Sequence, residues 1–344
     1  MKTTLKMTLF LVALTIGSRV FAQSIDPAKD PHIESHIKAF LNVLNSGTGK
    51  PIEQLTPTEA RKVLEDVQTS VKFDYSDIKV TEKTIQTENG PVVLNIVKPA
   101  NAKGTLPVFL FIHGGGWVLG DFPTHKRLVR DLVVNSGAAA VFVNYTRSPE
   151  AHYPVAINQE YAALKWVAAN GKEIGVDGKR LAVAGNSVGG NMTAALALMA
   201  KDKNGPKIRL QLMMWPVTDA NFETESYSKL GEGRFLTKKM MQWFWDNYAP
   251  DENARKEIYA SPLRASIEQL KGLPKAYIMV AENDVLRDEG EAYGRKLDEA
   301  GVQVTSVRYN GMIHDWGLLN PIADVPGTRS AMLQAAAELK KALK

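Results

Sequence analysis

The chain has 344 residues, of which 44% are hydrophobic and 23% charged, and its formal net charge is +5. Because it has neither a strong basic excess nor a dense cluster of Lys and Arg residues, its charge pattern excludes nucleic acid as a partner. The absence of cysteine excludes a disulfide framework, a cysteine-based metal site and a cysteine nucleophile.

The amino terminus has the pattern of a signal peptide, which we predict to span Met1–Ala22. Lys2 and Lys6 precede an apolar run, Met7–Ile16, that is too short to cross a membrane. Small residues occupy positions −3 and −1 before a cut after Ala22. Its removal lowers the formal charge from +5 to +2. The signal-peptide pattern predicts export, to a periplasm or to the cell exterior. An uncleaved amino-terminal anchor is the alternative. No later segment is apolar enough for stable membrane insertion.

The remainder, residues 23–344, contains no linker or repeat and is predicted to form a single domain. Asp30–Thr69 has apolar residues at the three- and four-residue spacing of helices, and Thr56 stands where a second helix would begin. His32 and His36 lie one helical turn apart and could in principle hold a metal. Since neither a third ligand nor the glutamate of H-E-x-x-H accompanies them, we expect no metal there.

Next come the predicted strands. Ile78–Thr87 and Val92–Val97 flank a turn and are expected to pair antiparallel. Continuous apolar runs then alternate with helical patterns. The runs are Val108–Ile112, Ala139–Val143, Leu181–Ala184, Ile208–Met214 and Ala276–Val280; the helical patterns are Arg127–Val134, Val155–Ala169 and Met192–Ala200; Val302–Tyr309 is the last strand. This alternation predicts an α/β fold with a mostly parallel, twisted sheet covered by helices on both faces.

A long excursion separates the strand that ends near Pro216 from the one that begins near Ala276. Within it, Phe235–Tyr248 is too rich in Met, Trp and Phe for an ordinary surface helix. Connections this long are commonly functional. We therefore predict a helical cap over the carboxyl edge of the sheet, built from residues 24–75 and 219–250. The alternative is that these aromatic side chains serve only packing.

One apolar run, Leu181–Ala184, leads into Gly185-Asn186-Ser187-Val188-Gly189-Gly190 and then an Ala/Leu-rich helix. A strand, G-x-S-x-G and a helix form the pattern of a nucleophile elbow, which raises the serine at the carboxyl end of a sheet. Gly185 and Gly189 are required because the turn is tight. The backbone N–H of Val188 and the positive helix end would lie beneath the serine. A plain strand-to-helix turn is the alternative.

The loop after the strand Val108–Ile112 reads His113-Gly114-Gly115-Gly116-Trp117. This is the place of an oxyanion loop in α/β-hydrolases, and three glycines let backbone N–H groups approach a substrate. A phosphate-binding loop is the competing interpretation. It is disfavoured because no G-x-G-x-x-G or G-K-[ST] pattern follows.

Acyl transfer by serine also needs a base and a carboxylate that orients it. Asp284 follows the apolar run Ala276–Val280, and His314 follows the last predicted strand. The order Ser, Asp, His is the one that α/β-hydrolases use. For Asp284, and likewise for Asp315, the alternative is an ordinary helix N-cap or turn residue.

Several ordered motifs together resemble the hormone-sensitive-lipase-like branch of the α/β-hydrolases. They are HGGGW at 113–117 with Gly120-Asp121, GNSVGGN at 185–191, WPVTD at 215–219, SPL at 261–263, DVLRDE at 284–289 and GMIH at 311–314. The similarity runs from about Ile78 to the carboxyl terminus. It implies an α/β-hydrolase fold and the hydrolysis of short- to medium-chain carboxylic esters without metal or cofactor.

The resemblance also assigns roles to residues. Ser187 would be the nucleophile, His314 the general base and acid, and Asp284 the carboxylate that orients it. The oxyanion donors would be the N–H groups of Gly115, Gly116 and Val188, with Gly114 shaping the loop. His113 begins the same motif.

Two departures from the family pattern concern the substrate. The family usually has Asp before the nucleophile and Ala after it, where this chain has Asn186 and Val188. Valine keeps the backbone N–H but adds bulk beside the pocket. The family's Y-R-L-A-P-E stretch is only partly kept at Asn144–Glu150.

The sequence therefore predicts an exported serine carboxylic-ester hydrolase that acts on a small-molecule ester through an acyl-enzyme. A lipase, lactonase or amidase could use the same machinery. A small-molecule binding protein on a hydrolase scaffold is a third hypothesis. The oligomeric state is not predicted.

Overall fold

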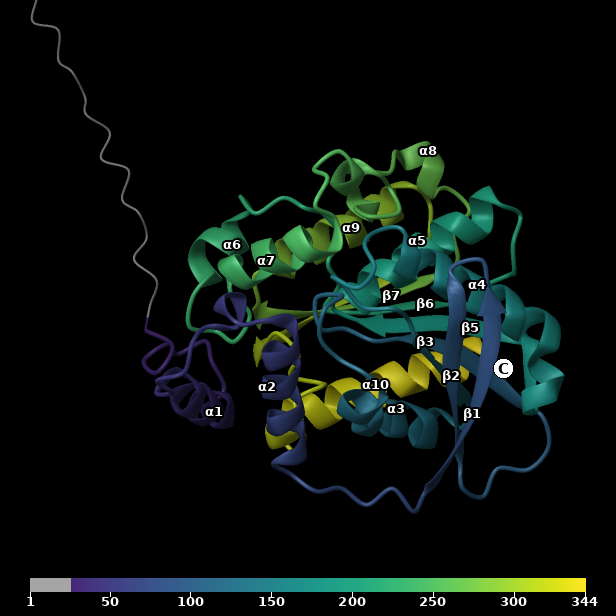
Figure 1. Cartoon of the computed structure of the whole chain (residues 1–344), viewed down its shortest axis with the longest axis horizontal. Coiled ribbons are helices and arrows are strands. Elements are labelled where there is room, and N and C mark those ends of the chain that lie inside the picture. Colours follow the sequence, from purple (N-terminus) through teal and green to yellow (C-terminus); the bar gives the residue numbers. More distant parts are fainter. Residues whose placement is uncertain (1–25) are drawn as a thin grey trace, which may run out of the picture.

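The computed structural model describes residues 26–344, in which eight strands form one sheet (Figure 1). The strands are β1 (Ile78–Thr87), β2 (Gly90–Pro99), β3 (Leu106–Ile112), β4 (Ala139–Asn144), β5 (Val176–Asn186), β6 (Gln211–Met214), β7 (Ala276–Asn283) and β8 (Val304–Ile313). Their spatial order is β1-β2-β4-β3-β5-β6-β7-β8. β2 pairs antiparallel with β1 and β4, and the remaining neighbours are parallel. The predicted mostly parallel sheet with an antiparallel edge is confirmed. The signal peptide predicted for Met1–Ala22 lies outside the described residues.

The sheet is accompanied by ten α-helices within residues 26–344. They are α1 (Ser35–Asn45), α2 (Pro57–Thr69), α3 (Phe122–Ser136), α4 (Val155–Asn170), α5 (Val188–Asp202), α6 (Glu225–Leu230), α7 (Lys238–Tyr248), α8 (Ile267–Leu270), α9 (Arg287–Glu299) and α10 (Pro326–Ala342). Short 3₁₀ turns occupy Ile52–Gln54, Gly171–Ile174, Ala254–Lys256, Pro262–Arg264 and Asn320–Ile322. The predictions above did not include α6, α8, α9 and α10. Helix α9 was not predicted because of its composition: it has many charged side chains and only two large apolar ones that are buried, Tyr293 and Leu297.

Alternate side chains of the central strands enter different cores. In β3, Val108, Leu110 and Ile112 pack with α4 and α5 on one face of the sheet, whereas Phe109 and Phe111 pack with α3 and α10 on the other. α9 packs with α5 and β7 in a third cluster. Figure 1 displays these two helix layers, with α3 and α10 below the sheet and α4, α5 and α9 above it. Burial on both faces explains the continuous apolar runs in the sequence.

The amino-terminal helices and the long excursion meet at one end of the sheet (Figure 1). A buried ion pair, Asp30 to Arg234 at 2.7 Å, joins them, and Asn45 donates a hydrogen bond to the Gly233 carbonyl at 3.0 Å. The aromatic helix α7 begins at Lys238, later than predicted, because the Thr237 hydroxyl accepts the Met240 N–H and caps the helix.

Candidate active site

Ser187 lies at a sharp corner between β5 and α5. Its φ is 54° and its ψ is −119°, a backbone conformation that non-glycine residues rarely adopt. A Cβ atom on Gly185 would lie 2.3 Å from the Gly189 carbonyl oxygen, and one on Gly189 would lie 2.0 Å from the Ile112 carbonyl oxygen. The two glycines are therefore needed for the turn and for close packing of α5 against the end of β3.

The three side chains predicted for acyl transfer come together at the carboxyl ends of β5, β7 and β8. His314 Nε2 lies 3.0 Å from Ser187 Oγ, and His314 Nδ1 lies 2.7 Å from Asp284 Oδ2. All three residues are at most 4% exposed. Because the Asp284 carboxylate can only accept, Nδ1 carries the proton, and Nε2 is left free to accept the serine proton.

The electrostatic environment of His314 favours its charged form. Burial by itself lowers the pKa of the imidazole, but the charges of Asp284 and Asp315, with the hydrogen bond to Asp284, outweigh it and raise the pKa above its ordinary value of 6.5. The ring therefore gains a proton at a higher pH than a free histidine.

This predicts the acid limb of the pH–rate profile. Only neutral His314 can accept the Ser187 proton, so kcat/KM should fall as the pH drops through the raised pKa, with a midpoint above 6.5. The measurement is kcat/KM for p-nitrophenyl acetate, whose charge does not change over this range. A midpoint at or below 6.5 would contradict the electrostatic description.

The glycine-rich loop carries backbone N–H groups that have no hydrogen-bond partner among the described residues. Gly115 and Gly116 have φ values of 99° and 63°, which favour glycine. Within residues 26–344, no hydrogen-bond partner is found for the N–H groups of Gly115, Gly116 and Val188. A Cβ atom on Gly116 would lie 2.1 Å from the Phe244 ring of α7. The loop is thus pressed beneath the aromatic helix with its donors unoccupied.

Aromatic stacking and a histidine fix the shape of this loop. The Trp117 ring stacks on Tyr248 of α7, with 4.0 Å between ring centres. His113 donates from Nδ1 to the Gly114 carbonyl at 2.8 Å and stacks on Tyr145 at 4.1 Å. Burial holds the pKa of His113 well below its ordinary value, so the ring is neutral. It orders the loop rather than supplying charge.

The loop that departs from the family pattern, Asn144–Glu150, packs against the same glycine-rich segment. Arg147 donates to the Gly120 carbonyl at 2.8 Å. Arg61 of α2 donates to the Val118 carbonyl at 2.8 Å and pairs with both carboxylate oxygens of Glu150 at 2.7 Å. These contacts join Asn144–Glu150 and α2 to the glycine-rich segment.

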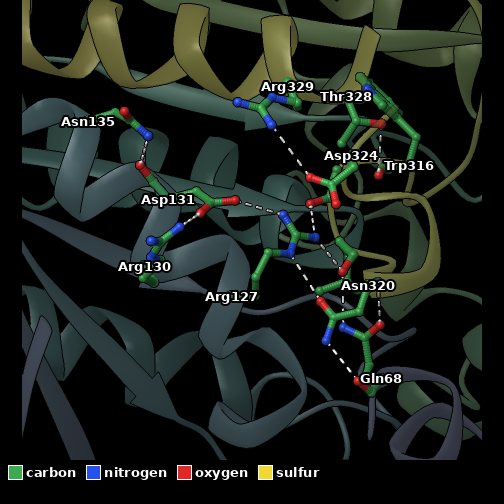
Figure 2. A network of polar contacts seen from close by, with 12 residues as sticks. Gln68, Arg127, Arg130, Asp131, Asn135, Trp316, Asn320, Asp324, Thr328 and Arg329 are labelled. Atoms are coloured by element: carbon green, nitrogen blue, oxygen red, sulfur yellow. Dashed lines mark hydrogen bonds and ion pairs between the residues drawn. The ribbon is translucent and has the colours of Figure 1, made fainter. Parts of the chain in front are cut away.

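The segment that follows His314 is held by a buried polar network (Figure 2). Arg127 of α3 donates to the carbonyls of Gly317 and Leu318 at 2.7 and 2.8 Å, and to the Asn320 side chain at 3.0 Å. Gln68 of α2 accepts the Asn320 N–H at 2.9 Å and donates to the Leu318 carbonyl at 3.0 Å. Two helices therefore fix the chain that carries the imidazole.

Removing the buried guanidinium should destabilise the protein. In Arg127→Met, the Gly317 carbonyl and the Asn320 oxygen lose their donor while remaining buried, and the Leu318 carbonyl and Asp131 each lose one of two, which costs about 3–5 kcal/mol. The free energy of unfolding in urea measures this loss. The matched control is Arg329→Met, because that guanidinium is 67% exposed and lies 3.6 Å from Asp324. The control should change stability by less than about 0.5 kcal/mol; equal effects would contradict the structural role.

Sequence reasoning did not identify two residues near the triad. Asp315, considered only as a turn or cap residue, is 6% exposed, and its Oδ2 lies 3.9 Å from His314 Nε2. Trp215, noted only within a motif, donates from Nε1 to Asp315 Oδ1 at 2.7 Å. The one available signal was that Asp315 directly follows His314.

The two amino-terminal histidines do not converge. His32 Nδ1 lies 3.3 Å from Glu282, whereas His36 Nδ1 lies 2.8 Å from Glu34. No cluster of three or more His, Asp or Glu side chains suited to a metal occurs among residues 26–344. Over the same part of the chain, no helix has the length and apolar character needed to cross a membrane.

An eight-stranded, mostly parallel sheet with a serine at a strand-to-helix elbow, facing His314 and Asp284, is the architecture of an α/β-hydrolase. The comparisons agree, since residues 109–318 match the family model for the alpha/beta hydrolase fold. The chain belongs to this family, in its hormone-sensitive-lipase-like branch.

Relatives and solved structures match nearly full length. The chain is 34% identical to Carboxylesterase NlhH of Mycobacterium tuberculosis, over 92% of this chain and 97% of that protein. It is 30% identical to Ethyl acetate hydrolase of Pseudomonas putida, over 84% of this chain and 93% of that protein. A thermostable esterase from Pseudomonas putida matches with a TM-score of 0.91 and 65% identity, over 92% of this chain and 99% of that chain.

Proposed function

We propose that this chain is a carboxylesterase that hydrolyses short- to medium-chain acyl esters through Ser187, His314 and Asp284. The observation that carries the proposal is the continuous pair of contacts from Ser187 Oγ to His314 Nε2, at 3.0 Å, and from His314 Nδ1 to Asp284 Oδ2, at 2.7 Å. Relatives named as carboxylesterase and esterase support ester hydrolysis as the reaction.

The reaction follows from this geometry in two stages. Ser187 Oγ attacks the ester carbonyl while His314 Nε2 takes its proton, and His314 then gives that proton to the departing alcohol. Water next attacks the acyl-enzyme with His314 again as base, which releases the acid and restores Ser187. Asp284 keeps the ring oriented and stabilises the imidazolium that forms in each stage.

The negative oxygen of each tetrahedral intermediate needs donors. We assign this role to the N–H groups of Gly115, Gly116 and Val188, which have no partner within residues 26–344. Val188 begins α5, so the positive end of that helix adds to the stabilisation.

We infer a preference for a short acyl group from the crowding next to the nucleophile. A Cβ atom on Gly116 would lie 2.1 Å from the Phe244 ring, and Val188, which directly follows Ser187, is completely buried. The relative named Ethyl acetate hydrolase supports a small acyl group as well.

A chain-length series tests this preference. With p-nitrophenyl esters from acetate to palmitate, kcat/KM should be highest for acetate or butyrate and fall steeply for longer chains, since a long chain must displace buried aromatic side chains. A maximum at the long-chain esters would instead identify a lipase. Matched lactone and anilide substrates distinguish a lactonase or an amidase by the same measurement.

We further propose that residues 24–75 and 219–250 act as a cap and that Met1–Ala22 directs export. The contacts of α7 with the glycine-rich loop, and the ion pair of Asp30 with Arg234, support the first. The charged start and short apolar run support the second. Cell fractionation of a tagged protein tests export, and recovery of full-length protein in the cytosol would contradict it.

A further inference from the structure

A buried chain of hydrogen bonds links the glycine-rich loop to Asp315, whose carboxylate lies beside His314, by a path that avoids the nucleophile. The Gly114 N–H donates to Asn186 Oδ1 at 3.0 Å, and Asn186 Nδ2 donates to Asp315 Oδ1 at 3.2 Å. Trp215 Nε1 donates to the same oxygen at 2.7 Å. Both bonds end on Oδ1, which leaves the other carboxylate oxygen facing His314 Nε2 at 3.9 Å.

We propose that Asp315 is a positioning residue of the active site: its carboxylate stabilises the imidazolium form of His314 and, through Asn186, holds the backbone at the start of the oxyanion loop. His314 would then lie between two carboxylates, with Asp284 on Nδ1 and Asp315 beside Nε2. The inference rests on the proposed role of His314 as the base.

The side chain at position 186 supports this arrangement. The middle member of the chain must accept a hydrogen bond from Gly114 and donate one to Asp315, and an amide does both. An ionised aspartate at 186 could accept the first bond but could not donate the second, and it would place two carboxylates in contact. The presence of Asn186 before the nucleophile is therefore explained by the charge of Asp315.

The backbone of Asp315 leaves an alternative to test. Its φ is 59°, in the left-handed region, where Asp and Asn are tolerated better than most residues. A purely structural role in the turn would explain its presence without any charge. Asparagine tolerates the same conformation and offers the same Oδ1 acceptor, so Asp315→Asn removes the charge and keeps the turn and both bonds to Oδ1, with an NH₂ group in the place of Oδ2.

Other groups near this pair are neutral or already accounted for. The polar groups that face His314 are Asp284, Asp315 and Ser187. Asp315 also faces Asn186, Trp215 and His125 of α3. His125 in turn interacts with Asp121 and Arg127. Burial lowers the pKa of His125 to about 4, so this ring carries no charge near neutral pH. Asp315 raises the pKa of both rings, but near neutral pH His314 is the one whose protonation changes.

The first test reads His314 directly, without a substrate. NMR titration of protein labelled with ¹⁵N-histidine gives the pKa of His314 in the wild type, in Asp315→Asn and in Asp324→Asn. Asp324 is 87% exposed and lies on the same loop, so it is the matched control. Removing a unit negative charge about 4 Å away should lower the pKa of His314 by about one pH unit or more. The control variant should leave the pKa of His314 unchanged. Equal pKa values in the two variants would overturn the proposal.

The proposal also predicts the kinetics of the same variants. In Asp315→Asn the acid limb of kcat/KM should move to lower pH by the same amount as the pKa measured by NMR. A fall in kcat at every pH with an unmoved limb would assign Asp315 a structural role only. Because the NMR titration needs no turnover, it tests the role of Asp315 even if the protein has no esterase activity. Failure of the one proposal is therefore distinguishable from failure of the other.

The second test addresses Asn186 and does not depend on the Asp315 variant. In Asn186→Asp two carboxylates meet in a buried site, so one must be protonated for folding. The deficit in Tm relative to wild type should grow as the pH rises from about 5 to about 9, because protonating the pair becomes harder. The exposed change Asn101→Asp is the control. A deficit that does not vary with pH would contradict the facing carboxylate.

Discussion

Ser187→Ala should lower kcat/KM for p-nitrophenyl butyrate by about 10⁴- to 10⁶-fold, the largest effect that any single substitution is expected to have. Without Oγ there is no group 3.0 Å from His314 Nε2 to form the acyl-enzyme. The residual rate would come from the oxyanion donors and substrate binding acting on water.

This variant should remain folded, which makes the activity loss interpretable. Alanine removes one oxygen from a side chain that is 4% exposed, and the backbone bonds of the elbow stay in place, including Ser187 N–H to the Met214 carbonyl at 2.8 Å. Equal activity in the two proteins, with unchanged thermal unfolding, would contradict Ser187 as the nucleophile.

Asp284→Asn should lower kcat by about 10⁴-fold while leaving KM nearly unchanged. The amide can turn its NH₂ group toward His314 Nδ1, which then favours the tautomer with the proton on Nε2, where it cannot accept the serine proton. Loss of the negative charge also lowers the pKa of His314, because Asp284 is the main group that raises it. The acid limb should therefore move to lower pH.

A matched control separates this effect from a general loss of charge. Asp298 lies exposed on α9, away from the triad, and Asp298→Asn should retain full activity. A loss below about 10-fold in Asp284→Asn would mean that another group orients the imidazole; Asp315 would be the candidate to test next.

The residues of the candidate site were predictable because their signals are local. Gly185–Gly190 and His113–Trp117 each combine an apolar strand with the glycines that a tight turn or a close backbone approach requires. Asp284 and His314 follow their strands directly, so parallel topology alone brings them to one edge of the sheet.

Contacts between distant parts of the chain were not predictable. Asn186 meets Asp315 across 129 residues, and Gln68 meets Asn320 across 252. A polar residue within a helix or loop carries no pattern that names such a partner, because its role depends on tertiary packing. Helix α10 was missed for a different reason: its buried face is mostly alanine, so its hydrophobic periodicity is weak.

Ser187 is the proposed nucleophile, which acquires the acyl group during the reaction. The most direct test of this role is mass spectrometry after treatment with a fluorophosphonate, which mimics the tetrahedral intermediate at an activated serine. We predict one adduct per chain, on the peptide that contains Ser187, with parallel loss of esterase activity and no adduct in Ser187→Ala. Absence of an adduct on Ser187, or full activity after complete labelling, would contradict the proposed mechanism.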